Sequence, residues 1–253
     1  MSEWWLVYLG IGAVVGFLAG LLGIGGGAII VPLLTWAFSA QGLPDAQVLH
    51  LALGTSMATI FFTSLSSMRA HHRHGAVDWK IAAAITPGIL AGSFGAALVA
   101  GALPTRPLAM IFTALVFGAA VQIFFDLKPR TARALPGPAG LFGAGAVIGT
   151  ASSLFAAGGA FLTIPFFMGC SVPVRRAIGT AAAVGFPIAV AGSAGYLLRG
   201  HIHWQALALI VVTSMALAPL GARTAYRVPV RRLRMIFALM MFGMSMRMLT
   251  TLW

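Results

Sequence analysis

Long apolar runs constrain this chain more than any other feature. Two of them, residues 4–38 and 137–170, hold no charged residue over about 35 positions each. A helix needs about 20 such residues to cross a bilayer core, whereas a barrel strand would alternate over about ten. Six further runs have about 18–23 residues, the length of a single crossing: 48–68, 79–101, 107–125, 177–198, 204–222 and 235–252. The pattern therefore predicts an all-α polytopic membrane protein.

The charged residues support this class. They make up 8% of the chain, against roughly a quarter in soluble domains. All four acidic residues fall at the ends of runs or between them, which argues against an intramembrane carboxylate relay or cation site: Glu3, Asp45, Asp78 and Asp126. Motifs of zinc proteases and serine hydrolases are absent from the sequence. We therefore expect neither an enzyme nor a metal or cofactor site.

The two long runs are interrupted by glycine. A straight helix of 35 residues would be about 50 Å long, which exceeds the bilayer core by roughly 20 Å. Glycines occur near the middle of each run, at 23 and 25–27 in the first and at 158–159 in the second, and Pro32 and Pro165 follow. Because glycine and proline interrupt helices, we expect each long run to form a broken helical hairpin.

The second half of the chain repeats the first. At an offset of 133, the glycines at 10, 12, 16, 25 and 26 and Pro32 recur at 143, 145, 149, 158, 159 and 165. At an offset of 125, Gly54-Thr55 recurs as Gly179-Thr180 and Trp79 as Trp204. This internal similarity predicts a first transmembrane repeat at 1–127, a cytoplasmic linker at 128–136 and a second repeat at 137–253.

The basic residues predict how the repeats are oriented. If each long run crossed the membrane once, the 16 Lys and Arg residues would divide equally between the two faces. If each run returns as a hairpin, the halves are inverted, and 13 basic residues share one face, against Arg106, Arg199 and Arg247 on the other. Short cytoplasmic loops are rich in Lys and Arg. We therefore expect two inverted repeats, each a glycine-broken hairpin plus three transmembrane helices.

Inverted repeats with broken helices are typical of secondary transporters, whose substrates bind at the breaks. A helix that starts inside the membrane presents free N–H groups and a positive dipole end, which together bind an anion. Hydroxyl groups near the breaks would add donors, including those of Ser152 and Ser153. The predicted substrate-binding residues are Gly25, Gly26, Gly27, Ala28, Thr55, Ser56, Gly158, Gly159, Ala160, Phe161 and Thr180.

Simpler interpretations of these residues stay open. Membrane glycines often serve only close helix packing, and Ser and Thr often bond to their own backbone. The histidines of residues 71–74 fit a solvated cytoplasmic loop better than a metal site, because no carboxylate accompanies them. His50, near the start of a run, fits an interfacial residue, with a gate or a proton site as the alternative.

The segment from Gly16 to Leu34, GFLAGLLGIGGGAIIVPLL, resembles the N-terminal signature of the sulfite exporter TauE/SafE family of membrane permeases. Gly54-Thr55-Ser56 and the second copy at 149–165 are similar to that family too, although Ala160 and Ala181 replace a glycine and a serine there. The resemblance covers nearly the whole chain. It implies transport of sulfite, organosulfonates or related sulfur-containing anions, often outward, by a multi-pass protein of the bacterial inner membrane.

We therefore expect a secondary transporter that exports a small anion by alternating access. Its partners would be the anionic substrate and the lipid bilayer, without nucleic acid. A proton could be the coupling ion, carried by a weakly acidic substrate because no buried acid is present. The alternatives are an anion channel and a non-transporting membrane scaffold or subunit.

Overall fold

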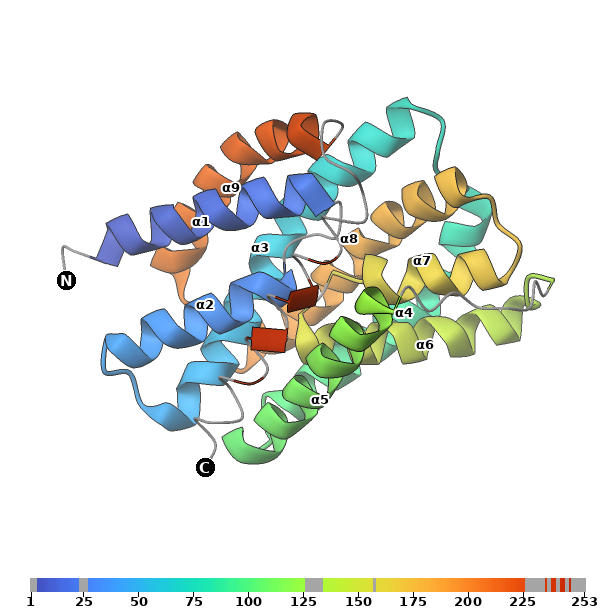
Figure 1. Ribbon diagram of the computed structural model, residues 1–253. Helices are drawn as coiled ribbons and strands as arrows, with labels where there is room; N and C mark the ends of the chain where they lie inside the picture. Colours follow the sequence, from blue (N-terminus) through green and yellow to red (C-terminus); the bar gives the residue numbers. More distant parts are fainter. Residues whose placement is uncertain are drawn as a thin grey trace.

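The chain folds into a bundle of helices (Figure 1). The computed structural model describes residues 4–22, 27–125, 134–156 and 158–225, together with positions 235, 238, 239, 242, 243 and 246. The regular structure of these residues is helical, as predicted. The helices are α1 (Trp4–Leu22), α2 (Gly27–Ala40), α3 (Asp45–Arg73), α4 (Trp79–Ala100), α5 (Thr105–Phe124), α6 (Pro138–Phe155), α7 (Ala160–Gly169), α8 (Val174–Leu198) and α9 (Trp204–Ala225).

Five of the described helices are long and apolar enough to cross a membrane, judged by length and composition: α3, α4, α5, α6 and α8. Shorter apolar stretches of 10–17 residues occur in α1, α2, α7 and α9. The predicted runs between 4 and 222 therefore correspond to helices. Most of the last predicted run, 235–252, and residues 128–133 of the predicted linker lie outside the described residues.

Each of the two long runs forms a pair of helices, as predicted. In the first pair, Tyr8 near the start of α1 packs on Phe38 near the end of α2, so the two helices run antiparallel (Figure 1). In the second pair, α7 turns back over α6, and Ala156, Gly158 and Gly159 make the turn with φ of 51°, 67° and 80°. Such positive φ values are strained for residues with a Cβ, which explains the glycines.

The second interruption lies at Gly158 and Gly159, and neither proline interrupts its helix. Pro32 lies inside α2 and Pro165 inside α7, so each helix continues through its proline. Each proline leaves one carbonyl of the preceding turn without its helical N–H donor. Residues 23–26, which contain the first predicted break, lie outside the described residues.

Helices of the two halves pack on each other in a reciprocal way. α1 packs along α9 and α6 along α4, while α3 and α8 pack at the centre. On α1, Gly12 and Gly16 lie against the backbone of residues 210 and 214 of α9. On α6, Gly145 and Gly149 lie against the backbone of residues 85 and 89 of α4. These are the same positions under the offsets of 133 and 125, so the repeat in the sequence is also a repeat of contacts.

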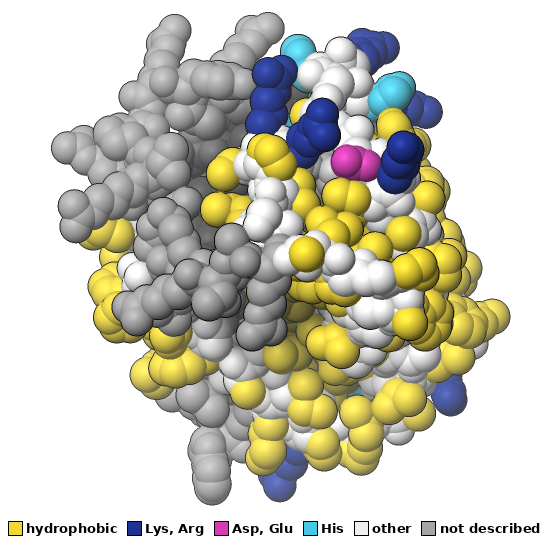
Figure 2. Space-filling model, turned by 90° about the vertical axis from the view of Figure 1, so that its right-hand side faces the viewer, with side chains coloured by type: hydrophobic (Ala, Val, Ile, Leu, Met, Phe, Trp, Pro, Cys, Tyr) yellow, Lys and Arg dark blue, Asp and Glu magenta, His cyan; other side chains and the backbone are white. Residues whose placement is uncertain are grey.

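One end of the bundle, which we name the basic end, joins the α3–α4 loop to the start of α8. An Arg175 guanidinium nitrogen donates to the His74 carbonyl oxygen over 3.3 Å, and Arg176 lies 3.9 Å from the Asp78 carboxylate. Figure 2 shows basic and histidine side chains gathered at the top of that view, around an acidic side chain. The described basic residues of these segments are Arg69, Arg73, Lys80, Arg175 and Arg176.

The opposite end joins the start of α3 to the α4–α5 turn and to the 199–203 loop. His50 Nε2 lies 2.9 Å from the Leu103 carbonyl oxygen, and the rings of His50 and His201 are 4.9 Å apart. Arg106 and Arg199 belong to these segments. The α3–α4 loop and the start of α8 therefore share one end, which is the grouping that the hairpin arrangement predicts for these two segments.

Candidate functional site

Two helix starts meet on either side of one buried side chain, Ile60 of α3. A methyl group placed on Gly27, the first residue of α2, would lie 2.6 Å from Ile60 Cδ1. A methyl group on Gly158, just before α7, would lie 3.2 Å from Ile60 Cγ2. Gly27 also lies against the carbonyl of Ala156. Two regions 130 residues apart are thus brought together at the middle of the bundle.

A narrow cavity, which we name the groove, extends from Ile60 toward the basic end between α3 and α8. Its volume is about 40 Å³, which is room for about three water molecules. It is lined by Ile60, Thr63, Ser64, Ser67 and His71 of α3, by Ile178, Ala182 and Gly185 of α8, and by Gly158 and Ala160. Ser67 and Ile178 are exposed, whereas Ile60 and Gly158 are buried, so the groove opens at the basic end.

The closed end of the groove holds the start of α7. The first N–H groups of a helix have no partner within that helix, and groups in the position of Ala160 and Phe161 can bind an anion. Gly159 caps this helix, and its carbonyl accepts from Thr163 Oγ1 over 2.6 Å. The groove therefore leads to a helix end with positive dipole charge.

Hydroxyl groups line the α3 wall of the groove. Ser64 Oγ donates to the Phe61 carbonyl over 3.2 Å, and Thr63 Oγ1 donates to the carbonyls of Ile60 and Thr59 over 3.2 and 3.4 Å. These are long bonds to the helix's own backbone, which a better acceptor in the groove can replace. The wall can thus supply donors to an anion.

More hydroxyls lie buried near the breaks. Among the described residues, those of Ser56, Ser152 and Ser153 have no hydrogen-bond partner although each residue is fully buried. An unsatisfied buried donor costs about 1–3 kcal/mol, so such groups favour a polar ligand. Ser56 lies one turn before Ile60 on the same face of α3, whereas the groove residues of α3 come after Ile60. Ile60 thus separates Ser56 from the groove.

Two of the predicted ligands, Thr55 and Thr180, join the halves to each other. Thr55 Oγ1 accepts from the backbone N–H of His203, and Thr180 Oγ1 accepts from that of Asp78, both over 2.9 Å. The offset of 125 relates the two acceptors, Thr55 and Thr180, to each other, and it relates the two donors, Asp78 and His203, in the same way. Asp78 caps α4, and His203 precedes α9. Each hydroxyl therefore holds the start of a helix in the other half.

The structure describes some of the predicted substrate-binding residues fully, and others only in part or not at all. Gly25 and Gly26 lie outside the described residues, and Ala28 belongs to α2 without a described side chain. Phe161 is half-buried and packs on Phe155 with ring centres 6.1 Å apart. Gly27, Gly158, Gly159 and Ala160 lie together around the closed end of the groove.

Sequence reasoning missed the groove wall. The lining residues that it did not select as ligands are Ile60, Thr63, Ser64, Ser67, His71, Ile178, Ala182 and Gly185. The available signal was the spacing of Ser56, Ser64 and Ser67, which puts three hydroxyls on one face of a long apolar helix.

The repeat-related positions at the opposite end are packed. The offset of 125 relates Thr63, Ser64, Ser67 and His71 of the groove to Ile188, Ala189, Gly192 and Tyr196. It relates Ile178, Ala182 and Gly185 to Leu53, Met57 and Ile60, and Ile60 itself lies at the closed end of the groove. All seven of these equivalents are buried. The Tyr196 hydroxyl donates to the Ser153 carbonyl over 3.1 Å, and Gly192 lies against Met57. Among the described residues, the α3–α8 interface is therefore open at the basic end and packed at the opposite end.

Histidines surround this packed end. Burial lowers the pKa of His201, and the charges of His50 and Arg199 lower it further. Burial also lowers the pKa of His203, whose ring lies 5.2 Å from Phe38 and 5.8 Å from Tyr8. Both imidazoles therefore favour the neutral form, which avoids a buried charge at the closed end.

Comparison with known proteins assigns the family. The family model described as sulfite exporter TauE/SafE matches residues 8–248. The chain belongs to the TauE/SafE family. This TauE/SafE protein is 32% identical to a "Probable membrane transporter protein" of Haemophilus influenzae, over 96% of the chain and 97% of the relative. It is 30% identical to the "Probable membrane transporter protein YdhB" of Bacillus subtilis, over 85% of the chain and 87% of the relative.

An archaeal relative shows how widely such proteins occur. The "Probable membrane transporter protein MJ0441" of Methanocaldococcus jannaschii is 25% identical, over 94% of the chain and 93% of the relative. No solved structure matches the TauE/SafE protein. It is thus a multi-pass membrane protein of a transporter family, and the relatives are described as transporters rather than enzymes.

Proposed function

We propose that this protein is a secondary transporter that exports a small sulfur-containing anion, sulfite or an organosulfonate, across a bacterial inner membrane by alternating access. The observation that carries the proposal is the groove, which leads from the basic end to the start of α7, whereas the repeat-related positions at the opposite end are packed. A site reached from one side at a time is the requirement for alternating access.

In this proposal the segments 1–127 and 137–253 are inverted repeats. The hairpins α1–α2 and α6–α7 then enter from opposite faces, in agreement with their directions in Figure 1. The reciprocal bonds of Thr55 and Thr180 also support the relation. Short basic loops face the cytoplasm, so the basic end is cytoplasmic and the groove opens inward.

The anion would bind at the breaks. It would enter along Ser67 and Ser64, and the first N–H groups of α7, those of Ala160 and Phe161, would attract it. Gly27, with Gly25, Gly26 and Ala28 beside it in the sequence, would form the matching site across Ile60. A weakly acidic substrate would carry its own proton, which makes a carboxylate relay unnecessary.

Ile60 would form the barrier between the two access states. Its side chain lies between Gly27 and Gly158 and separates the groove from the buried Ser56 hydroxyl. Outward opening then requires the packed end, around Met57 and Tyr196, to separate while the groove closes. The bonds of Thr55 and Thr180 would hold the loops about which the halves rock.

The test is sulfite counterflow into proteoliposomes that contain the purified protein. We expect saturable exchange of labelled sulfite against internal sulfite. Ala182→Trp fills the groove and should reduce exchange at least tenfold. Leu198→Trp changes an exposed residue at the far end of α8 and serves as the control, with exchange within twofold of the original chain.

Other outcomes would identify the alternatives. Flux that does not saturate and shows no counterflow would indicate an anion channel. If neither sulfite, taurine, sulfoacetate nor thiosulfate is transported or raises the melting temperature of the protein, a non-transporting subunit becomes the better interpretation. Equal loss in both tryptophan variants would contradict the groove as the pathway.

A further inference from the structure

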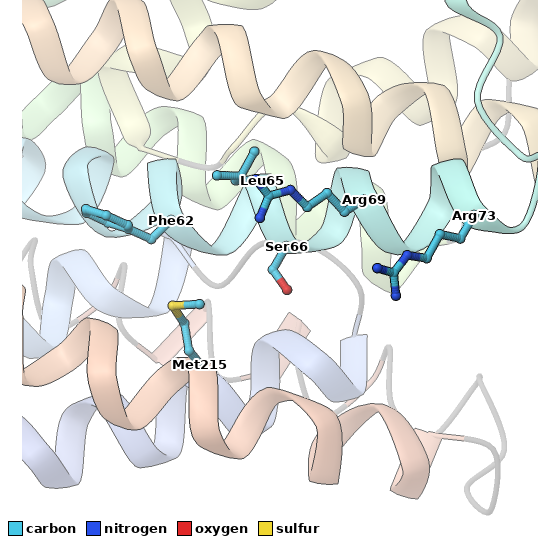
Figure 3. A pocket seen from close by; sticks show the side chains of 6 residues that line it. All are labelled: Phe62, Leu65, Ser66, Arg69, Arg73 and Met215. Atoms are coloured by element: carbon cyan, nitrogen blue, oxygen red, sulfur yellow. The ribbon is translucent and has the colours of Figure 1, made fainter.

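A second and larger cavity lies on a different face of α3, between α3 and α9. Its volume is about 330 Å³. Figure 3 shows the residues that line it: Phe62, Leu65, Ser66, Arg69 and Arg73 of α3, and Met215 of α9. It shares no lining residue with the groove. The cavity is therefore a separate feature that the proposed transport does not use.

The repeat supplies a comparison for this cavity. The positions related to its lining residues, all of them apolar, are Pro187, Val190, Ala191, Ala194, Leu198 and Leu90. In that half, α8 packs closely on α4, and Gly195 lies against the backbone of Phe94. The corresponding helices α3 and α9 leave a cavity, and two arginines and a serine stand where the other copy has two alanines and a leucine.

The lining has a polar and an apolar part. Arg73 is the last residue of α3, and Arg69 and Ser66 lie within the two turns before it. Phe62 and Met215 lie farther from the basic end, and their side chains are 39% and 46% exposed. In Figure 3 the Ser66 hydroxyl and the Met215 side chain point into the space between the helices. The cations thus lie at the basic end and the apolar surface toward the middle of the membrane.

We propose that this cavity binds an anionic phospholipid of the leaflet at the basic end. One guanidinium group can donate two parallel hydrogen bonds to two phosphate oxygens. Arg69 and Arg73 would therefore hold the lipid phosphate, while Ser66 donates a further hydrogen bond. The first part of an acyl chain would lie along Phe62 and Met215. Basic pockets between transmembrane helices near the cytoplasmic surface recognise such headgroups.

The test compares lipid binding in detergent solution, with dioleoyl phosphatidylglycerol as the probe and dioleoyl phosphatidylcholine as the neutral reference. A basic residue near an anionic lipid contributes about fivefold in affinity, so the double variant Arg69→Gln with Arg73→Gln should bind phosphatidylglycerol about 30-fold more weakly. The double variant Arg175→Gln with Arg176→Gln removes two exposed charges of the same end outside the cavity, and it should stay within threefold.

A third variant separates the cavity from surface charge. Met215→Trp fills the space with all charges kept, and it should also weaken phosphatidylglycerol binding at least fivefold. Equal weakening in the two arginine double variants, unchanged binding by Met215→Trp, or displacement of the lipid by equimolar inorganic phosphate would overturn the proposal. None of these outcomes depends on sulfite transport, so the two proposals stand or fall separately.

Discussion

The two ends of the α3–α8 interface come from equivalent positions of the repeat and differ in structure. At the basic end, small and hydroxyl-bearing residues such as Ser64, Ser67 and Gly185 leave the groove. At the opposite end, the larger Ile188, Tyr196 and Met57 occupy the positions related to Thr63, His71 and Ala182, and the interface is closed. One backbone arrangement thus supports both an open and a packed end.

Side-chain volume, and not the repeated fold, therefore decides which end of the α3–α8 interface is open. Burying a large apolar side chain stabilises the folded state by about 1.5–3 kcal/mol, so Leu53, Met57 and Tyr196 favour the closed opposite end. A ligand shifts such a balance only by the difference in its affinity for the two states. Substitutions at related positions therefore test the comparison directly.

The largest effect is expected from filling the open end. A methyl group on Gly185 would lie 2.8 Å from the Gly158 carbonyl oxygen, so Gly185→Leu should abolish the groove and reduce sulfite exchange more than tenfold. Gly143→Leu is the control, because nothing lies within 4 Å of a methyl group there. Exchange assays on both variants check this; similar activity in the two would contradict the open end as the pathway.

Ile60 forms the boundary between the two ends, and shortening it should change selectivity. Ile60→Ala should raise the rate for taurine relative to sulfite about fivefold, because the passage between Gly27 and Gly158 widens. Competition between the two anions measures the ratio. Removing a buried isoleucine costs about 2–5 kcal/mol in any case. Ile210→Ala, in the α1–α9 interface, should be as costly without a change in selectivity.

The hydroxyls of Thr55 and Thr180 test whether the two ends contribute equally to the stability of the fold. Thr55→Val and Thr180→Val each remove one buried acceptor for a backbone N–H of the other half. Each should lower the free energy of unfolding by about 1–3 kcal/mol, because an N–H loses its partner. Denaturation of the two variants in the same detergent measures this. A large loss in one variant alone would show that the repeat relation does not extend to the energetics.

The smallest effect concerns pH at the packed end. Because the pKa of His201 is lowered in the folded state, the unfolded chain takes up the proton first as pH falls. The stability that the neutral ring provides is present above about pH 6.5 and decreases below it. Melting curves between pH 7.5 and 5.5 should show this decrease, and His201→Gln should reduce it. An unchanged slope in the variant would exclude His201 as the group responsible.

Much of the fold could be predicted from the chain because the bilayer imposes length and polarity. The apolar runs, the two broken hairpins and the grouping of Arg69 and Arg175 at one end follow from segment lengths and loop charges. The interruption at Gly158 was predicted, while the continuation of α7 through Pro165 was not, since a membrane helix tolerates a proline when neighbours satisfy its backbone.

The candidate site was harder to predict, because contacts between distant segments decide it. Thr55 and Thr180 were selected as ligands from their hydroxyl groups, yet each bonds a backbone N–H more than 100 residues away. Ile60 looked like any other apolar residue of a transmembrane helix. Its place between two breaks appears only when α2, α3 and α7 are assembled.

The membrane class and the break at Gly158 and Gly159 could be predicted from the chain alone, since they depend on local composition and on the thickness of the bilayer. The folded chain was needed to see that Ser64 and Ser67 line the groove, that Thr55 and Thr180 join the halves, and that the end around Met57 and Tyr196 is packed. Packing depends on the volumes of side chains that are distant in sequence and meet only in the folded protein, and no local pattern contains those pairings.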